Sequence, residues 1–331
     1  MATYRRLTRM SSLAWTPGEY SNPTALKSFR VADLNLAAEM ANAIDNNNYM
    51  GEYQPGPARA GGRWIDLSFT SELRGSDTAD VPPPEMSLLR ACAFEEAATG
   101  STPAIIYSYE LKDPHLITDT PAGDLEAIDI VHNVDRLVRT AENCVGNVVF
   151  NFTAGLMPTM AFRMRGNIVS AAAGATEDAI TAFDDYSLPV PVETSALTIT
   201  PLAGAAYTPI IKSLIYDCGN IIDPRADMNG EQGYSAPAIT GRKPSIVAIV
   251  ETDLIANINW ETIYTAQTPL AFSLTHNAGG GIREEVVVTF SALLNAMPQV
   301  TDVGGMACYI LTMDQWAPTS TFALKLAWAA A

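Results

Sequence analysis

The stretch PPPEMSLLRACAF, from Pro82 to Phe94, is one of the few runs in this sequence with helical spacing. Pro84 can occupy the first turn of a helix, where its missing N–H costs nothing, and Glu85 then lies at the positive end of the helix dipole. An apolar stripe follows at helical spacing and consists of Leu88, Leu89, Cys92 and Ala93. We therefore predict a helix near residues 84–94, which is too short to be stable alone and must pack on a sheet or barrel.

The segments on both sides of this helix alternate between apolar and polar residues, as strands do when one face is buried. In the stretch 63–75, the alternate residues from 65 to 69 define the apolar face of a strand. A tight turn with Gly155 and Pro158 joins two further strands. The predicted strands after the first cover residues 104–111, 127–140, 146–155, 158–167, 195–199, 210–220, 243–255, 270–277, 284–295 and 320–328. This pattern is typical of a mainly β, antiparallel barrel or sandwich with a short flanking α-helix.

The chain length and one change in composition suggest two units. The 331 residues correspond to about two domains at roughly 150 residues each. Residues 171–193 are small and acidic and end in alternating prolines, which is typical of a linker. On both sides of it the sequence shows a strand, a turn with Met-Pro and another strand. We therefore predict a first β domain over 1–170, with the helix near 84–94, and a second β domain over 194–331. The second domain either duplicates the first or shares with it only the general pattern of antiparallel β domains.

The charge balance argues against one class of function. The chain has 36 acidic and 20 basic residues, a formal net charge of −16, so it does not bind nucleic acid by neutralising phosphates. The charge fits a protein that must not stick to nucleic acid, and it fits plain solubility equally well. The sequence contains no run of about 18 apolar residues that could span a membrane, and its N-terminus lacks the apolar core of a secretory signal peptide. We expect a soluble protein made in a cytoplasm.

The residues that carry chemistry in other proteins show no such pattern here. The four cysteines lie far apart in the sequence, so we expect buried free thiols in a reducing compartment. The three histidines lack metal-ligand spacing, and no nucleophile, phosphate-loop or dinucleotide motif is present. The glycine-rich run 277–285 is expected to be a hairpin turn. We expect no catalytic residue, no metal and no cofactor, and hence no enzyme, although a glycosidase needs no local motif.

Several phrases, in order along the chain, resemble one protein family. PPPEMSLLRACAFEE follows a strand that ends in ELRG, and it is followed by VHNVDRLVRTAENCVGNVVFNFTAGLMPTMAFRMRGN. After the linker come LIYDCGNIIDPRADMNGEQGY and ITGRKP. This ordered series resembles the major tail tube proteins of tailed bacteriophages, of the siphophage type, over most of the chain. Two departures are Ala93, where the family phrase has glycine, and AENCVG, where the family has a GARG turn.

The resemblance implies a structural virion protein. Tail tube proteins have a small β-barrel or sandwich with a flanking helix, and they stack as rings into the hollow tube that delivers phage DNA to the host. The implied partners are further copies of the chain, the tail terminator, the tape measure and the baseplate or tail-tip proteins. DNA would pass without specific binding, and no membrane is involved. The implied location is the virion tail, assembled in the host bacterial cytoplasm. Two barrels per chain would close a ring of three chains, which we favour over six.

The resemblance also suggests two sets of site residues. Asp129, Asp135 and Glu142 are candidates for acidic residues that face the lumen, although they are equally well explained as solvated surface residues. The loop 49–62 is a candidate for a ring-stacking arm or a plain surface loop, with the following residues of interest: Tyr49, Tyr53, Pro55, Pro57 and Arg59. A carbohydrate-binding or adhesion sandwich of a virion is the alternative function. It would favour clustered aromatic residues, whereas the five tryptophans are dispersed in the sequence.

Overall fold

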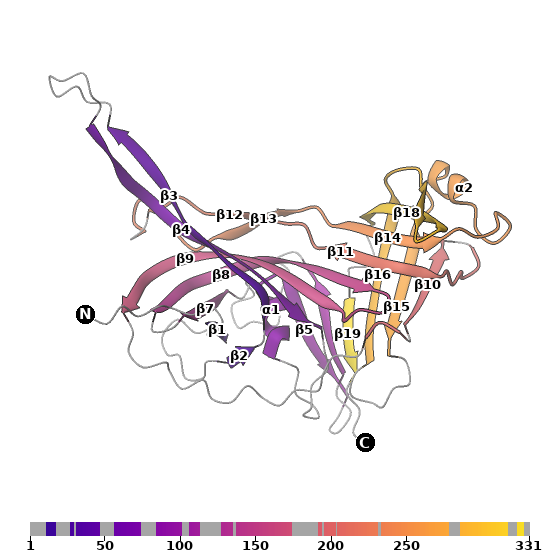
Figure 1. Ribbon diagram of the computed structural model, residues 1–331, viewed down its shortest axis with the longest axis horizontal. Coiled ribbons are helices and arrows are strands. Elements are labelled where there is room, and N and C mark those ends of the chain that lie inside the picture. Colours follow the sequence, from indigo (N-terminus) through magenta and orange to yellow (C-terminus); the bar gives the residue numbers. More distant parts are fainter. Residues whose placement is uncertain are drawn as a thin grey trace.

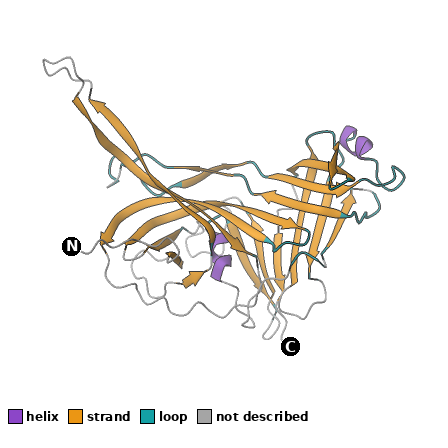
Figure 2. Cartoon of the chain, viewed as in Figure 1, coloured by secondary structure: helices purple, strands orange, loops and turns teal. Residues whose placement is uncertain are grey.

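The structure is a computed structural model. It describes residues 11–17, 27–29, 31–46, 56–73, 84–100, 106–112, 127–134, 137–173, 191–193, 195–202, 204–230, 233–277, 285–316 and 323–327. The described chain is mainly antiparallel β, as predicted, with two short α-helices, of which the sequence predicted only the first (Figure 2).

The strands of the first half are β1 (Ser11–Pro17), β2 (Lys27–Phe29), β3 (Ala32–Asn46), β4 (Gly56–Glu72), β5 (Phe94–Thr99), β6 (Ile106–Leu111), β7 (Ile128–Val134), β8 (Leu137–Thr153) and β9 (Thr159–Ala173). Those of the second half are β10 (Ala196–Pro201), β11 (Ile211–Asp217), β12 (Asn220–Asp223), β13 (Ala238–Arg242), β14 (Ser245–Glu251), β15 (Leu270–His276), β16 (Glu285–Leu294), β17 (Gln299–Val303), β18 (Met306–Gln315) and β19 (Ala323–Ala327). The α-helices are α1 (Ser87–Arg90) and α2 (Trp260–Thr265).

One long sheet runs through both halves of the molecule (Figure 1). Its antiparallel strand order is β3-β4-β9-β8-β11-β14-β18-β17. The pairing of β8 with β11 carries it from the first half into the second, with Asn151 opposite Ile215. The first part of β8 also pairs with β7, which is followed by β1 and β2. The two halves are therefore joined by main-chain hydrogen bonds as well as by the chain itself.

A second series of strands also connects the halves. Its order is β5-β6-β19-β16-β15-β10, again antiparallel throughout. The C-terminal strand β19 lies between β6 of the first half and β16 of the second. The end of β16 pairs with β18, so this series meets the long sheet there. Separate sheets for the two halves would not allow these connections.

The order of elements in the long sheet repeats. The first four strands have the order β3-β4-β9-β8, and the last four have the order β11-β14-β18-β17. In this match β3 corresponds to β11, β4 to β14, and the β8–β9 hairpin to the β17–β18 hairpin. A short helix follows β4 and another follows β14, and each helix leads into a hairpin, β5–β6 or β15–β16. This repeat is what a duplicated unit would show. The duplication and the two-domain division stay predictions, because the halves share one sheet.

Two sequence predictions about strands need correction. Residues 127–140 are not one strand but the hairpin of β7 and β8, with Val134 opposite Leu137. Alternation continues through both arms of so tight a hairpin, and the sequence pattern therefore hides the reversal. The β8–β9 turn is where Gly155 and Pro158 predicted it. β9 continues to Ala173, into the start of the segment predicted as a linker, of which residues 174–190 lie outside the described ranges.

The predicted helix is real but shorter than expected. A 3₁₀ turn at Pro84–Met86 leads into α1, which ends at Arg90, and β5 already begins at Phe94. Leu88 and Leu89 are fully buried, so the apolar stripe packs on the sheet as the sequence predicts. The prediction that the helix extends to residue 94 is wrong, because residues 91–93 form a turn between α1 and β5.

Ala93 makes this turn possible. Its φ is 66°, in the left-handed region, where a side chain crowds the backbone. Its N–H donates to the Arg90 carbonyl at 3.2 Å, and its carbonyl accepts from the N–H of Lys112 at 3.0 Å. Its methyl group is completely buried. Glycine is the residue that this backbone conformation ordinarily selects.

We expect Ala93→Gly to change the free energy of unfolding by less than about 1 kcal/mol, because relief of the left-handed strain offsets the greater freedom of an unfolded glycine. Ala93→Val should lower it by about 2 kcal/mol or more. Ala91→Val is the matched control, since Ala91 is equally buried but has a φ of −70°. Urea unfolding measures all three variants. Equal losses for the two valine variants would contradict a backbone origin.

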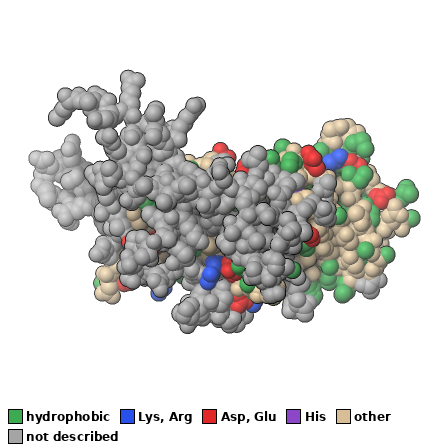
Figure 3. All heavy atoms as spheres, turned by 90° about the horizontal axis from the view of Figure 1, so that it is seen from below, with side chains coloured by type: hydrophobic (Ala, Val, Ile, Leu, Met, Phe, Trp, Pro, Cys, Tyr) green, Lys and Arg blue, Asp and Glu red, His purple; other side chains and the backbone are tan. Residues whose placement is uncertain are grey.

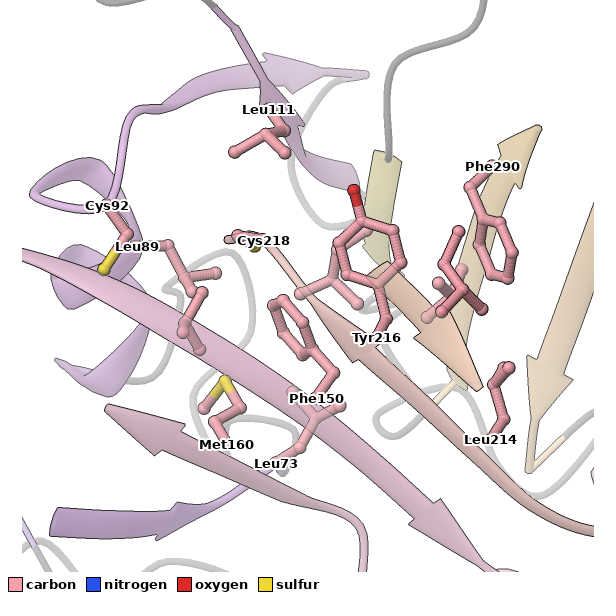
Figure 4. Close-up of a cluster of buried hydrophobic side chains, with 14 of the residues drawn as sticks. Leu73, Leu89, Cys92, Leu111, Phe150, Met160, Leu214, Tyr216, Cys218 and Phe290 are labelled. Carbon is pink, nitrogen blue, oxygen red and sulfur yellow. The ribbon is translucent and has the colours of Figure 1, made fainter. Parts of the chain in front are cut away.

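The core is one continuous cluster that spans both halves. A chain of aromatic contacts runs through it. Phe94 contacts Phe150 edge-on with ring centroids 6.1 Å apart, and Phe150 contacts Tyr216 at 6.5 Å. Tyr216 meets Phe290 at 5.5 Å. Figure 4 shows Phe150 and Tyr216 side by side, to the right of Leu89. Burial of these rings therefore couples the stability of the first half to that of the second.

Phe150→Ala should lower the free energy of unfolding by about 3–5 kcal/mol, because it removes a fully buried ring from this chain of contacts. Val149→Ala, one residue earlier on the opposite face of β8, should cost about 1 kcal/mol or less. Chemical denaturation should show a single transition in both proteins. If the wild-type protein unfolded in two separate transitions, the shared core would not couple the halves.

Candidate assembly surfaces

Asn220 connects the second half to the first through hydrogen bonds. We call this site the junction, and it consists of Cys92, Gly146, Asn147, Asp217, Asn220 and Arg242. The Asn220 amide nitrogen donates to the carbonyls of Cys92 at 2.9 Å and Gly146 at 3.0 Å. Its amide oxygen accepts from Arg242 Nε at 2.8 Å. Its backbone N–H donates to Asn147 Oδ1 at 2.9 Å. Asn220 therefore uses both ends of its amide to hold four segments together.

Asp217 completes the junction from the end of β11. Its Oδ1 accepts from the Asn147 side-chain amide and from the Gly219 N–H, both at 2.8 Å. Gly219 has a φ of 63°, and a Cβ there would lie 2.0 Å from the Lys243 carbonyl oxygen, so only glycine fits. Arg242 also donates from Nη2 to the Lys112 carbonyl at 2.8 Å. The tight turn thus places Asn220 directly over β8.

The junction brings together phrases that are far apart in the sequence. ACAF supplies Cys92, the GN of β8 supplies Gly146 and Asn147, DCGN supplies Asp217 and Asn220, and ITGR supplies Arg242. These phrases are among those on which the resemblance to tail tube proteins depends. Sequence reasoning did not predict that they meet, because nothing in one chain shows which polar residues pair across about 130 positions.

Asn220→Asp should lower the free energy of unfolding by about 2 kcal/mol or more, because it replaces a donor of two hydrogen bonds by an oxygen that faces two carbonyls. Asn229→Asp is the matched control, since Asn229 is exposed and the substitution introduces the same negative charge. It should cost less than about 0.5 kcal/mol. Thermal and urea unfolding both report the difference, and equal small losses would show that the junction contributes little.

An ion pair fixes the β12 segment beside the first half. Arg165 on β9 binds Asp66 on β4 with two parallel hydrogen bonds, of 2.6 and 2.9 Å. Its Nη1 donates to the Ile222 carbonyl of β12 at 3.0 Å. These bonds to Asp66 raise the pKa of Arg165. The guanidinium carbon also lies 5.9 Å from the ring centre of Trp64, which Tyr234 contacts edge-on. Trp64 is therefore part of an internal contact between the halves.

The β3–β4 hairpin projects from the body as an arm (Figure 1). Residues 65–72 of β4 pair with β9, whereas residues 56–64 pair only with β3 among the described residues. An isolated two-stranded ribbon is at best marginally stable in water. The prediction of a loop over 49–62 is wrong for residues 56–62, which belong to β4 and include Pro57 and Arg59; alanines and glycines there hid the strand. Tyr49, Tyr53 and Pro55 lie outside the described residues.

Two of the three candidate lumen residues are neighbours in the structure. Asp129 on β7 lies opposite Glu142 and Asn143 of β8, on the face turned away from the buried Ile128 and Ile130. Asp129 Oδ1 accepts the Asn143 N–H at 2.9 Å, so this carboxylate also stabilises a bulge, where Asn143 has a φ of 57°. Asp135 lies outside the described residues. Asp129 and Glu142 thus form a half-buried acidic pair on one face.

Strands β3 and β17 stand at the two ends of the long sheet. Within the described residues, β3 pairs only with β4 and β17 pairs only with β18. Exposed hydrophobic side chains accompany the β17 end: Leu254, Ile255, Val300 and Met306, which are 51–74% exposed. Figure 3 shows hydrophobic side chains at this end of the molecule. Two open strand edges, one with apolar residues around it, are the features of this protein most suited to contact with another chain.

All four cysteines are free and buried, as predicted, and burial raises the pKa of Cys92, Cys144 and Cys218. No group of three His, Cys, Asp or Glu side chains in the described ranges could hold a metal ion. In the same ranges, no helix has the length and apolar character needed to span a membrane.

Comparison of the sequence with models of known families and with curated proteins gives no match.

Proposed function

We propose that the protein is the subunit of a phage tail tube, which polymerises as stacked rings around a channel for DNA. The observation that carries this proposal is the pair of open edges at opposite ends of one sheet. Soluble monomers normally block such edges, whereas a chain that assembles side by side uses them. The ordered phrases that resemble tail tube proteins support the same conclusion, and several of them build the junction.

The arm supplies the second kind of contact that a tube needs. Within the described ranges, its outer part consists of β3 and β4 alone, and it extends away from the body (Figure 1). In a stack of rings such an arm would lie against the next ring, where its unpaired edges would gain partners. Of the residues that the sequence predicts for this contact, Pro57 and Arg59 lie on the outer part of β4, and Tyr49, Tyr53 and Pro55 lie outside the described residues. Ring closure and ring stacking would thus use different parts of the chain.

The charge supports passage of DNA without binding. A net charge of −16 repels phosphates, and a channel lined by one sign of charge focuses this repulsion. Asp129 and Glu142 share a face of the β7–β8 hairpin and are the described candidates for the channel wall. We propose three chains per ring, because the repeated strand order gives each chain two similar units.

Electron microscopy of the purified protein, dilute and concentrated, tests the proposal. We expect rings or tubes with a central hole of about 40 Å, which leaves a duplex a margin of about one α-helix width. Persistent compact monomers at high concentration, also in the presence of preformed tail tips, would overturn it. Retention on a glycan column by those monomers would instead support the carbohydrate-binding alternative. Of the described tryptophans, Trp64 and Trp260 pack on other aromatic residues.

A further inference from the structure

We propose that β17 of one chain pairs with the first residues of β3 of the next, so that the long sheet continues from chain to chain. This assignment rests on the proposed function and names the contact that closes the ring. It is a heterologous contact, because two different edges meet, and such contacts close into rings when the rotation allows. The template for it is already present within the chain.

The template is the pairing of β8 with β11. β8 is the first arm of the β8–β9 hairpin, and five of its residues, 149–153, pair with β11. β17 is likewise the first arm of the β17–β18 hairpin and has five residues. β11 pairs with β14 as β3 pairs with β4. If the order of the long sheet continues, the strand that follows β17 is therefore a β3.

The directions of the strands agree with this continuation. Every neighbouring pair along β3-β4-β9-β8-β11-β14-β18-β17 is antiparallel. Eight strands that alternate in this way leave β17 antiparallel to β3. The beginning of β3 corresponds to β11. Two residues before the end of β4, Thr70 pairs with Ala32, at the start of β3. At the same place in β14, two residues before its end, Ile249 pairs with Ser213 of β11.

The turn after β17 shows which of its backbone groups are available. Gly304 and Gly305 have φ values of 64° and 84°, as in a two-residue turn of type I′. The residues that flank such a turn, Val303 and Met306, form a hydrogen-bonded pair. Hydrogen bonding to the partner strand alternates along an antiparallel strand. The N–H and C=O groups of Val300 and Asp302 therefore point away from β18, toward the open edge.

The side chains at this edge also suit a contact with a second copy. Val300 is 61% exposed and Met306 is 51% exposed, and both belong to the β17–β18 hairpin. β-Branched residues dominate the strand, which reads QVTDV. Edges of monomeric proteins usually have lysine, proline or a bulge to prevent pairing, and β17 has none of these and pairs regularly with β18. Its one charged side chain, Asp302, accepts a hydrogen bond from the Gly305 N–H of its own turn.

Val300→Pro tests the assignment because it deletes one outward N–H and leaves the hydrogen bonds to β18 in place. Proline is tolerated at an edge position whose N–H faces solvent, so the monomer should still fold. We expect Val300→Pro to raise the concentration needed for ring and tube formation by tenfold or more. Val300→Thr, which keeps the N–H and the branched shape, should shift it less than threefold. Light scattering and electron microscopy measure assembly, and thermal unfolding checks the fold.

The outcomes separate the contact from the function. Val300→Pro protein that is folded and still forms tubes like the wild type would overturn the β17 assignment and leave the tail tube proposal standing. Failure of the wild type to form rings would overturn the proposed function itself. If Val300→Pro unfolds the monomer, Val300→Lys replaces it, because an exposed charge blocks an edge without any change in the backbone. It should raise the critical concentration likewise.

Cross-linking between separate chains identifies the partner strand. Chains with Asp302→Cys are mixed with chains with Asn35→Cys and treated with a short flexible dithiol-reactive reagent. The four native cysteines are buried and should react slowly. We expect covalent dimers in the mixture and few in either variant alone. Equally abundant dimers from Asp302→Cys alone would show that β17 meets β17, which contradicts the head-to-tail contact.

Discussion

The pairing of β8 with β11 is the constraint on which the rest of the structure depends. Through five residue pairs it joins two similar groups of strands into one sheet, and Phe150 and Tyr216 come together beneath it. The chain leaves β11 through Asp217 and Gly219, and this turn directs Asn220 onto β8. The core, the junction and the open edges at both ends of the sheet all follow from the fact that the halves meet edge to edge.

An edge-to-edge contact between halves has a functional consequence. A chain whose halves meet face to face would cover its own surfaces, whereas edge-to-edge pairing always leaves one edge unused at each end. In this protein those edges are β3 and β17, and the arm extends from the same sheet through β3 and β4 (Figure 1). The geometry that stabilises the single chain therefore also leaves open the two edges on which the proposed assembly with further copies depends.

The sequence predicted the elements whose pattern is local. Alternation showed most of the strands, including β4, β14 and β16, and the apolar stripe at Leu88 and Leu89 placed the helix on the sheet. It missed α2, although Asn259 accepts a hydrogen bond from the Thr262 N–H as an N-cap, because the helix has only six residues. The arm was missed because its alanines and glycines have no clear period. The junction could not be predicted, since it depends on long-range pairing, and Asp129 and Glu142 became neighbours only through the hairpin of β7 and β8.

A cryo-electron microscopy reconstruction of one assembled ring tests the central claim most directly. Three chains in each ring, with six similar groups of strands and with each β17 beside a β3 of the next chain, are the predicted result. Six chains in each ring, or rings in which β17 remains exposed to solvent, would contradict the claim that the chain repeats its own internal β8–β11 contact when it assembles.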